Sequence, residues 1–156
     1  MNATATRDKP VDKSPERIRE MFGHVAPRYD LLNHLLSLNT DRYWRWRTVR
    51  LVAPDGQRPI LDLCAGTADL ALAYDRSVQG KVPITAADFC PEMLDVARKK
   101  IDRAGANERI SLVEADAENL PFEDDMFQIV AVAFGLRNVR DTDRGWGAMA
   151  PVAAPG

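Results

Sequence analysis

Apolar residues recur at helical spacing through the first third of the chain. A first helix is predicted to start at Ser14-Pro15, where serine is a favoured cap and proline a favoured first residue, and to end or bend at Pro27. A leucine-rich stretch over 31–38 predicts a second helix, and Thr40 or Asp41 can cap a third. The apolar positions of the first and third helices are Ile18, Met21, Phe22 and Val25, then Tyr43, Trp44, Trp46 and Val49.

From residue 59 the period changes to short apolar runs separated by helical segments. Runs 59–64, 82–87, 110–113 and 127–134 predict four strands, and helices are expected over 68–74, 91–104 and from Asp141 onward. The run 127–134 is continuous and apolar, as expected of a strand buried on both faces. Strands that alternate with helices predict right-handed βαβ units, and therefore an α/β fold with a parallel sheet. The second of these helices is expected to bury Met93, Leu94, Ala97 and Ile101.

Charge and turn residues divide the chain near residue 54. Residues 1–53 carry ten basic and six acidic groups, whereas residues 54–156 carry eleven basic and seventeen acidic groups. The turn-rich stretch 54–59 lies between the two parts. We therefore expect a flexible tail over 1–15, an N-terminal helical cap over 16–53 and a sheet domain over 54–156.

Composition excludes several classes of protein. The chain has 156 residues, of which 46% are hydrophobic, and a net charge of −2, which argues against a disordered tail and against a strongly basic nucleic-acid binder. The longest apolar run, 129–136, is too short to span a membrane, and residues 1–15 lack the apolar core of a secretion signal. With only two cysteines, Cys64 and Cys90, a reducing cytoplasm is the expected location, and we interpret both as small buried residues.

The first chemical feature is a turn of small residues directly after the first predicted strand, the segment from Asp62 to Asp69 with sequence DLCAGTAD. In an open α/β sheet, ligands bind beyond the carboxyl ends of the strands, and small residues let the backbone approach them. The segment is neither the G-x-G-x-x-G of a pyrophosphate binder nor a phosphate-binding loop with its lysine. It is also compatible with an ordinary strand-to-helix connection.

Two further acids follow the next strands. Asp88 ends the second predicted strand, where a carboxylate can accept both ribose hydroxyls of a nucleoside, and Asp116 follows the third, where it can accept from an adenine amino group. Acids at three successive strand ends, without phosphate-binding groups, fit S-adenosylmethionine, a nucleoside that bears a sulfonium and no phosphate. Taken singly, each aspartate is also a common helix cap or turn former.

Several longer segments resemble the UbiE/MenG-type quinone C-methyltransferases. The segments that carry the resemblance are FGHVAPRYDLLN (22–33), LSLNTDRYW (36–44), LDLCAGT (61–67) and FGLRNV (134–139). It extends from about Glu20 to the C-terminus. The resemblance implies a Rossmann-like S-adenosylmethionine-dependent methyltransferase that methylates a ring carbon of a prenylated hydroquinone, late in menaquinone or ubiquinone synthesis.

The resemblance also implies residue roles. Cofactor contacts are expected at the first turn, at the ends of the second and third strands, and at Ala133, where some members have a serine. Two positions depart from the family pattern, since Asp41 replaces a usual histidine and Ala68 a usual glycine. The expected cofactor contacts are Asp62, Gly66, Thr67, Asp88, Asp116, Ala117 and Ala133.

Methyl transfer to carbon suggests roles for a cation and for the helical cap. A ring carbon becomes nucleophilic when the adjacent phenol loses its proton, so Arg137, just beyond the fourth strand, is a candidate to stabilise the phenolate, or else a surface or capping arginine. Tyr29, Asp30 and Asn33 lie one turn apart on the second predicted helix. They either line the substrate mouth or brace the helix after Pro27.

The third predicted helix combines aromatic and basic residues. It is either a solvated face packed through its rings or a seat on an anionic membrane, where a prenyl tail resides. Its arginines are Arg42, Arg45, Arg47 and Arg50.

The resemblance extends over four strands, and the second signature of the family is absent from residues 1–156. We therefore expect a C-terminally truncated member in which the strand over 129–134 forms an uncovered apolar edge. Two functions remain open: an active methyltransferase, or a non-catalytic fragment that binds the cofactor or a partner without turnover. The oligomeric state is not predicted.

Overall fold

Three helices precede the sheet in the computed structural model, which describes residues 14–38 and 40–155. Helix α1 spans Pro15–Val25, a 3-10 turn (η1) spans Ala26–Arg28, α2 spans Tyr29–Leu36 and α3 spans Thr40–Leu51. The predicted interruption at Pro27 is confirmed as the 3-10 turn. The predicted tail over 1–15 falls mostly outside the described residues, and the proposed domain boundaries stay predictions.

The second part forms the predicted parallel sheet. Its strands are β1 (Ile60–Leu63), β2 (Ile84–Asp88), β3 (Ile110–Glu114) and β4 (Ile129–Val132), in the order β3-β2-β1-β4. All three pairings are parallel. Helices α4 (Asp69–Ser77) and α5 (Pro91–Arg103) connect the first three strands, and η2 (Gly135–Asn138) and α6 (Thr142–Val152) follow β4. The α/β Rossmann-like class is confirmed, and β1 and β4 flank the point where the strand order reverses.

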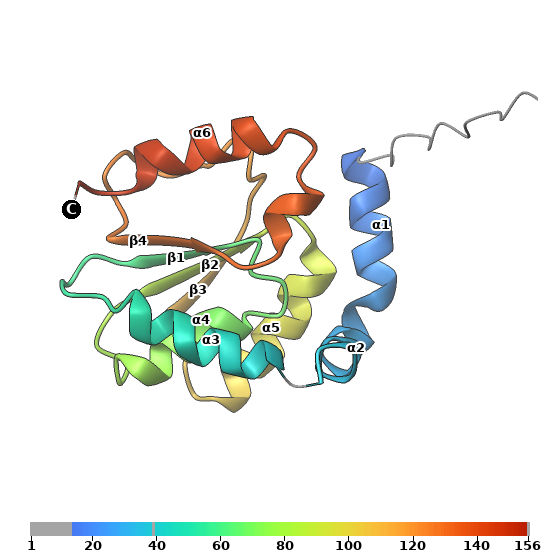
Figure 1. Cartoon of the computed structure of the whole chain (residues 1–156), viewed down its shortest axis with the longest axis horizontal. Helices are drawn as coiled ribbons and strands as arrows, with labels where there is room; N and C mark the ends of the chain where they lie inside the picture. Colours follow the sequence, from blue (N-terminus) through green and yellow to red (C-terminus); the bar gives the residue numbers. More distant parts are fainter. Residues whose placement is uncertain (1–13, 39, 156) are drawn as a thin grey trace, which may run out of the picture.

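The elements form three layers (Figure 1). Helices α3, α4 and α5 cover one face of the sheet and α6 covers the other, while α1 and α2 lie beyond the carboxyl ends of the strands. Strand β1 alternates between these faces: Ile60 belongs to the apolar cluster with α4, whereas Leu61 and Leu63 belong to the cluster with Met149 of α6. The predicted buried face of α5, from Met93 to Ile101, is confirmed.

Strand β4 is shorter and less buried than predicted. All four of its residues are half-buried, so the expectation of a strand buried on both faces is wrong. The reason is its position: β4 pairs with β1 alone among the strands that the structure describes, and this agrees with the expected apolar edge. Phe127 lies outside the strand and forms an isolated parallel bridge with Ala153.

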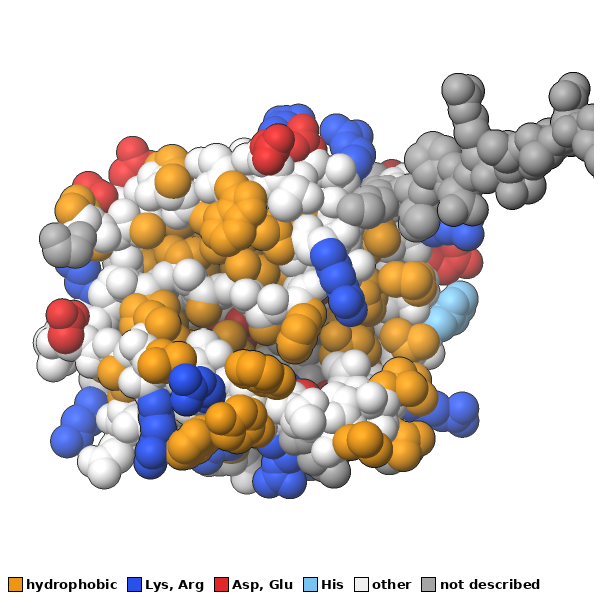
Figure 2. Space-filling model, in the orientation of Figure 1, with side chains coloured by type: hydrophobic (Ala, Val, Ile, Leu, Met, Phe, Trp, Pro, Cys, Tyr) orange, Lys and Arg blue, Asp and Glu red, His pale blue; other side chains and the backbone are white. Residues whose placement is uncertain are grey.

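The outer face of α2 and α3 carries large apolar side chains. Figure 2 shows them over these two helices, along the lower part of the view, with arginines or lysines among them. Trp44 is 56% exposed and Trp46 47% exposed, so the rings of α3 are not packed into the core. The buried contact of α3 is made by Val49, which joins the cluster around α4. None of the helices within 14–38 and 40–155 has the length and apolar character of a membrane span.

Candidate functional site

The turn between β1 and α4 is conformationally strained. Cys64, Gly66 and Ala68 all have positive φ, at 53°, 56° and 62°. Left-handed backbone costs a non-glycine residue about 1–2 kcal/mol, so the surrounding structure must stabilise this turn. Such strain gathers at ligand sites in folded proteins, and three positive-φ residues between positions 64 and 68 make this turn a candidate for one.

Asp62 supplies the missing helix cap of α4. The N-cap residue, Ala68, has no capping side chain, and the carboxylate of Asp62 instead accepts a 2.9 Å hydrogen bond from the backbone N–H of Ala71. Asp62 is 1% exposed. Burial raises its pKa to about 7, because the loss of hydration outweighs the hydrogen bond from Ala71.

Asp88 joins the end of β2 to the same turn. Its two oxygens accept hydrogen bonds from the backbone N–H of Gly66, at 2.7 Å, and of Cys90, at 2.9 Å. Burial raises the pKa of this carboxyl. Each carboxylate oxygen can accept two hydrogen bonds, so Asp88 keeps acceptor capacity for a ligand with paired hydroxyls.

The ends of β3 and β4 complete the edge. Asp116 is exposed, and its Oδ1 accepts from the backbone N–H of Glu118 at 2.9 Å, which is the turn-forming role open to it. Beyond β4, Gly135 lies so close to the turn that a Cβ there would be 2.1 Å from Cβ of Cys64. Only glycine therefore fits where the two strand ends meet.

These strand ends and the N-terminal helices enclose a cavity of about 760 Å³, within the usual range for small-molecule sites. All the site residues predicted from the sequence line it except Asp30. They are Tyr29, Asn33, Asp62, Gly66, Thr67, Asp88, Asp116, Ala117, Ala133 and Arg137.

Helices α1 and α2 form the wall opposite the strand ends. A Cβ on Gly66 would lie 3.8 Å from the ring of Tyr29, so this ring covers the turn. The ring also packs edge-on against Phe22, with the ring centroids 6.1 Å apart. Both rings pack against a small buried cluster that includes Ala26 and Met93, and this cluster joins these helices to α5.

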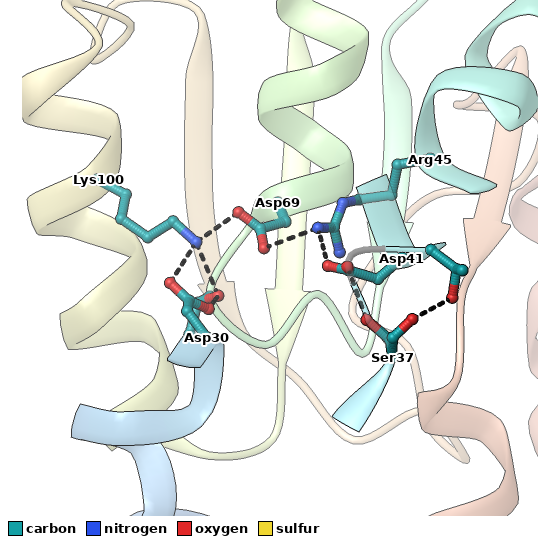
Figure 3. A network of polar contacts seen from close by, with 8 residues as sticks. Asp30, Ser37, Asp41, Arg45, Asp69 and Lys100 are labelled. Atoms are coloured by element: carbon teal, nitrogen blue, oxygen red, sulfur yellow. Dashed lines mark hydrogen bonds and ion pairs between the residues drawn. The ribbon is translucent and has the colours of Figure 1, made fainter. Parts of the chain in front are cut away.

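Asp30 binds neighbouring side chains instead of lining the cavity (Figure 3). Its carboxylate accepts from the hydroxyl of Thr67 at 2.6 Å and from Nζ of Lys100 at 2.7 Å. Lys100 also donates to Asp69 at 2.5 Å and to Thr67 at 3.0 Å, so all three donors of its ammonium group are used. We call Asp30, Thr67, Asp69 and Lys100 the polar junction, because they join α2, the turn, α4 and α5.

The polar junction continues into α3. Arg45 lies 3.4 Å from Asp69 and pairs with Asp41, which also accepts from the hydroxyl of Ser37 at 2.9 Å. Asp41 is 7% exposed. Positive and negative groups alternate along this series, so each carboxylate is compensated as it leaves water.

Lys100, Asp69 and Arg45 were not predicted as site residues. A signal existed for Lys100, which lies seven positions after Met93 and three after Ala97 and therefore falls on the buried face of α5. A lysine on such a face needs a partner. Its partner Asp30 is 70 residues away, a pairing that helical periodicity does not reveal.

The thiols and the candidate cation complete the lining. Both cysteines are free, and burial raises the pKa of Cys64 to about 12 and of Cys90 to about 11, so both remain thiols at neutral pH. Arg137 extends from η2, with its guanidinium 5.9 Å from the ring centroid of Phe134. Arg137 and Arg140 both line the cavity, so this part of its wall carries positive charge.

Similar proteins come from quinone biosynthesis. The chain is 43% identical over 135 residues to the ubiquinone/menaquinone biosynthesis C-methyltransferase UbiE of Geobacter sp. strain M21, covering 86% of this chain and 57% of that protein. It is 46% identical over 136 residues to the demethylmenaquinone methyltransferase of Thermus thermophilus, covering 87% and 60%. The chain thus spans less than two thirds of the length of these relatives.

Solved structures share the fold at lower identity. The [4+2]-cyclase SpnF is 21% identical, with a TM-score of 0.77 over 92% of this chain and 57% of that one. A SAM-dependent methyltransferase from Aquifex aeolicus is 15% identical, with a TM-score of 0.63 over 91% and 68%. At these identities the likeness concerns the fold alone.

A family model also matches most of the chain. The model of the ubiE/COQ5 methyltransferase family aligns with residues 11–156, which includes the turn after β1, the ends of β2 and β3, and η2. The chain belongs to the ubiE/COQ5 methyltransferase family.

Proposed function

We propose that this chain carries the cofactor half of an S-adenosylmethionine-dependent methyltransferase that methylates a ring carbon of a prenylated hydroquinone. The observation that carries the proposal is the single cavity wall formed by the Gly66 turn, Asp88 and Asp116 at three successive strand ends. Family membership and the names of the relatives support the substrate class.

The cavity fits a nucleoside better than a nucleotide. Asp88 is held by two backbone N–H groups and keeps lone pairs for ribose hydroxyls, and the Gly66 turn allows the backbone to approach a ligand. Carboxylates at the strand ends would repel a phosphate. S-adenosylmethionine, when bound, supplies an electrophilic methyl group on a sulfonium. We assign its binding to Asp62, Gly66, Thr67, Asp88, Asp116, Ala117 and Ala133.

The remaining residues are assigned to the hydroquinone. Arg137 stabilises negative charge on the phenol oxygen, which makes the neighbouring ring carbon nucleophilic. Tyr29 and Asn33 line the mouth on the α2 side, and apolar side chains such as Phe89 and Phe134 suit an aromatic ring. We assign Asp30 a positioning role, since it holds Thr67 and Lys100.

The substrate class also bears on location. A prenyl tail resides in lipid, so a cytoplasmic enzyme that acts on its ring must contact the inner face of the membrane peripherally. We therefore propose a cytoplasmic protein with such a contact.

Calorimetric titration with S-adenosylhomocysteine tests the cofactor site. The parent is expected to bind, and Asp88→Ala and the isosteric Asp88→Asn to weaken binding at least about tenfold, because a charged hydrogen bond is worth about 1.5–3 kcal/mol. Asp95→Ala, an exposed position on α5, is the matched control and should bind like the parent. The cofactor assignment is refuted if the parent gives no heat of binding, or if the Asp88→Asn variant binds with the same affinity as the parent.

A methyl-transfer assay on demethylmenaquinol tests turnover. Arg137→Ala should lower kcat by about tenfold or more, as expected for loss of one charge-stabilising group. Arg103→Ala, at an exposed position on α5, is the control and should leave kcat unchanged. Cofactor binding without product would instead favour the non-catalytic fragment.

A further inference from the structure

Most of the exposed large apolar side chains of the described residues lie on α2, α3 and the residues beside them. Leu35, Leu36 and Leu38 are 66%, 81% and 83% exposed, and they lead directly into α3 with its exposed Tyr43 and Trp46. Leaving such side chains in water is costly, and a contiguous set of them marks an interaction site. In Figure 2 these helices carry apolar and basic side chains together.

The orientation of α3 is set by its inner side. Asp41 and Val49 are buried and Arg45 is half-buried, and these positions recur every four residues. Helical geometry then places Tyr43, Trp46, Arg47 and Arg50 on the opposite side, facing away from the sheet. The aromatic and basic groups therefore share one outward face.

The outward side chains of α3 contact one another. The rings of Tyr43 and Trp46 are 5.8 Å apart, and the guanidinium of Arg50 lies 4.3 Å from the centroid of Trp46. Aromatic rings beside cations are the side chains that settle at the boundary between lipid headgroups and acyl chains.

The charge of this face has one sign. Between residues 32 and 52 the sequence has a single acid, Asp41, which is buried and paired with Arg45, whereas Arg42, Arg47 and Arg50 are exposed. The chain as a whole is slightly acidic, with a net charge of −2. A basic patch on an acidic protein selects an anionic partner, and exposed leucines and tryptophan select one with an apolar interior.

We propose that the face formed by Leu35, Leu36, Leu38, Tyr43, Trp46, Arg47 and Arg50 docks on an anionic lipid surface. Trp44 and Thr48 of α3 line the cavity, so the helix that carries this face also forms part of the cavity wall. The choice of lipid as the occupant rests in part on the proposed prenylated substrate, whereas the face itself does not.

Flotation with vesicles tests the proposal. The chain should float with vesicles of phosphatidylcholine that contain phosphatidylglycerol, and much less with pure phosphatidylcholine. Arg47→Glu with Arg50→Glu should lower partitioning at least about tenfold, because each arginine near an anionic surface contributes about 1 kcal/mol. Leu36→Ser with Leu38→Ser should lower it on both kinds of vesicle, and both positions are exposed, so folding is unaffected.

The control carries the same charge change elsewhere. Lys99→Glu with Arg103→Glu, both exposed on α5, should partition within about threefold of the parent. Equal losses in the two charge-reversed variants, or a parent that does not float, would overturn the proposal. So would a concentration-dependent dimer that Leu36→Ser with Leu38→Ser abolishes, since a second copy would then occupy the face.

Failure of docking is distinguishable from failure of the proposed function. Arg47 and Arg50 do not line the cavity, so the charge-reversed variant should bind S-adenosylhomocysteine like the parent. A chain that floats but does not bind S-adenosylhomocysteine refutes the cofactor assignment and leaves the docking face standing. The opposite result refutes docking and the membrane contact proposed above, and leaves the cofactor assignment standing.

Discussion

The two ends of the parallel sheet use charged side chains differently. At the amino ends, Arg109 pairs with Asp75 through two parallel hydrogen bonds of 2.8 and 3.0 Å, and a third reaches the backbone of Gly105. At the carboxyl ends, the polar junction shares Lys100 among three partners, two of them beside a strained turn. At the amino ends, the Arg109–Asp75 pair connects α4 to the residue before β3. At the carboxyl ends, the polar junction borders the cavity.

This difference in charge pairing predicts that the amino ends contribute to stability and the carboxyl ends to ligand binding. A bidentate arginine–carboxylate pair satisfies both groups and leaves little capacity for a ligand. The junction instead holds helices from distant parts of the chain against the turn, and Asp88 beside it keeps free acceptor sites. Changes at the amino ends should therefore alter unfolding alone, whereas changes at the carboxyl ends should alter ligand affinity as well.

The largest contrast is expected between two glycines. Gly135→Ala places a methyl 2.1 Å from Cβ of Cys64, which cannot move without the backbone, so it should cost about 1–3 kcal/mol and abolish S-adenosylhomocysteine binding. Gly80→Ala, with φ +69° and a methyl 2.6 Å from Nε of Arg109, strains the backbone and disturbs the pair with Asp75, so it should cost at least about 1–2 kcal/mol and spare affinity. Urea unfolding and calorimetry measure both. Unchanged affinity in Gly135→Ala contradicts the contrast.

A second contrast concerns two cations. Lys100→Met leaves Asp30 without a cation and Asp69 with Arg45 alone, so it should cost about 1–2 kcal/mol, weaken S-adenosylhomocysteine binding and speed amide exchange in residues 15–36. Arg109→Met should cost a similar amount without either local effect. Lys99→Met, on the exposed side of α5, is the control and should match the parent. Equal exchange rates in the Lys100 and Arg109 variants would mean that the junction does not hold the helices.

The smallest contrast is between two isosteric substitutions, Asp62→Asn and Asp75→Asn, which should change the free energy of unfolding in opposite directions. Asp62 has a pKa raised from 3.8 to about 7, so the folded state binds more protons than the unfolded state between these values, and stability falls as pH rises through this range. Asp62→Asn keeps an acceptor for Ala71, removes this loss and should gain on the order of 1 kcal/mol at pH 8.

Asp75→Asn is the counterpart at the amino ends. It breaks the charged pair with Arg109 and should lower stability at pH 8. Unfolding curves recorded from pH 5 to pH 8 compare the two variants. An Asp62→Asn variant with the same pH profile as the parent would contradict the raised pKa.

Local patterns predicted much of the fold and of the cavity lining. The strand positions, the break at Pro27 and the cap at Asp141, which accepts from the N–H groups of Asp143 and Arg144, all depend on neighbouring residues. The acids at the strand ends were predicted to lie together because parallel strands end at one edge. Burial of β4 was not predictable, because it depends on which strands flank it and not on its own apolar run.

The sequence by itself determined the succession of strands and helices along the chain and the turn of small residues after the first strand. It also placed Asp62, Asp88 and Asp116 at successive strand ends. These follow from periodicity and turn chemistry within a few residues. Only the tertiary structure decided that Lys100 pairs with Asp30, that Gly135 meets Cys64 and that the α3 rings of Tyr43 and Trp46 face outward. Such contacts join residues up to 71 positions apart, and packing selects them from many partners that local sequence permits equally.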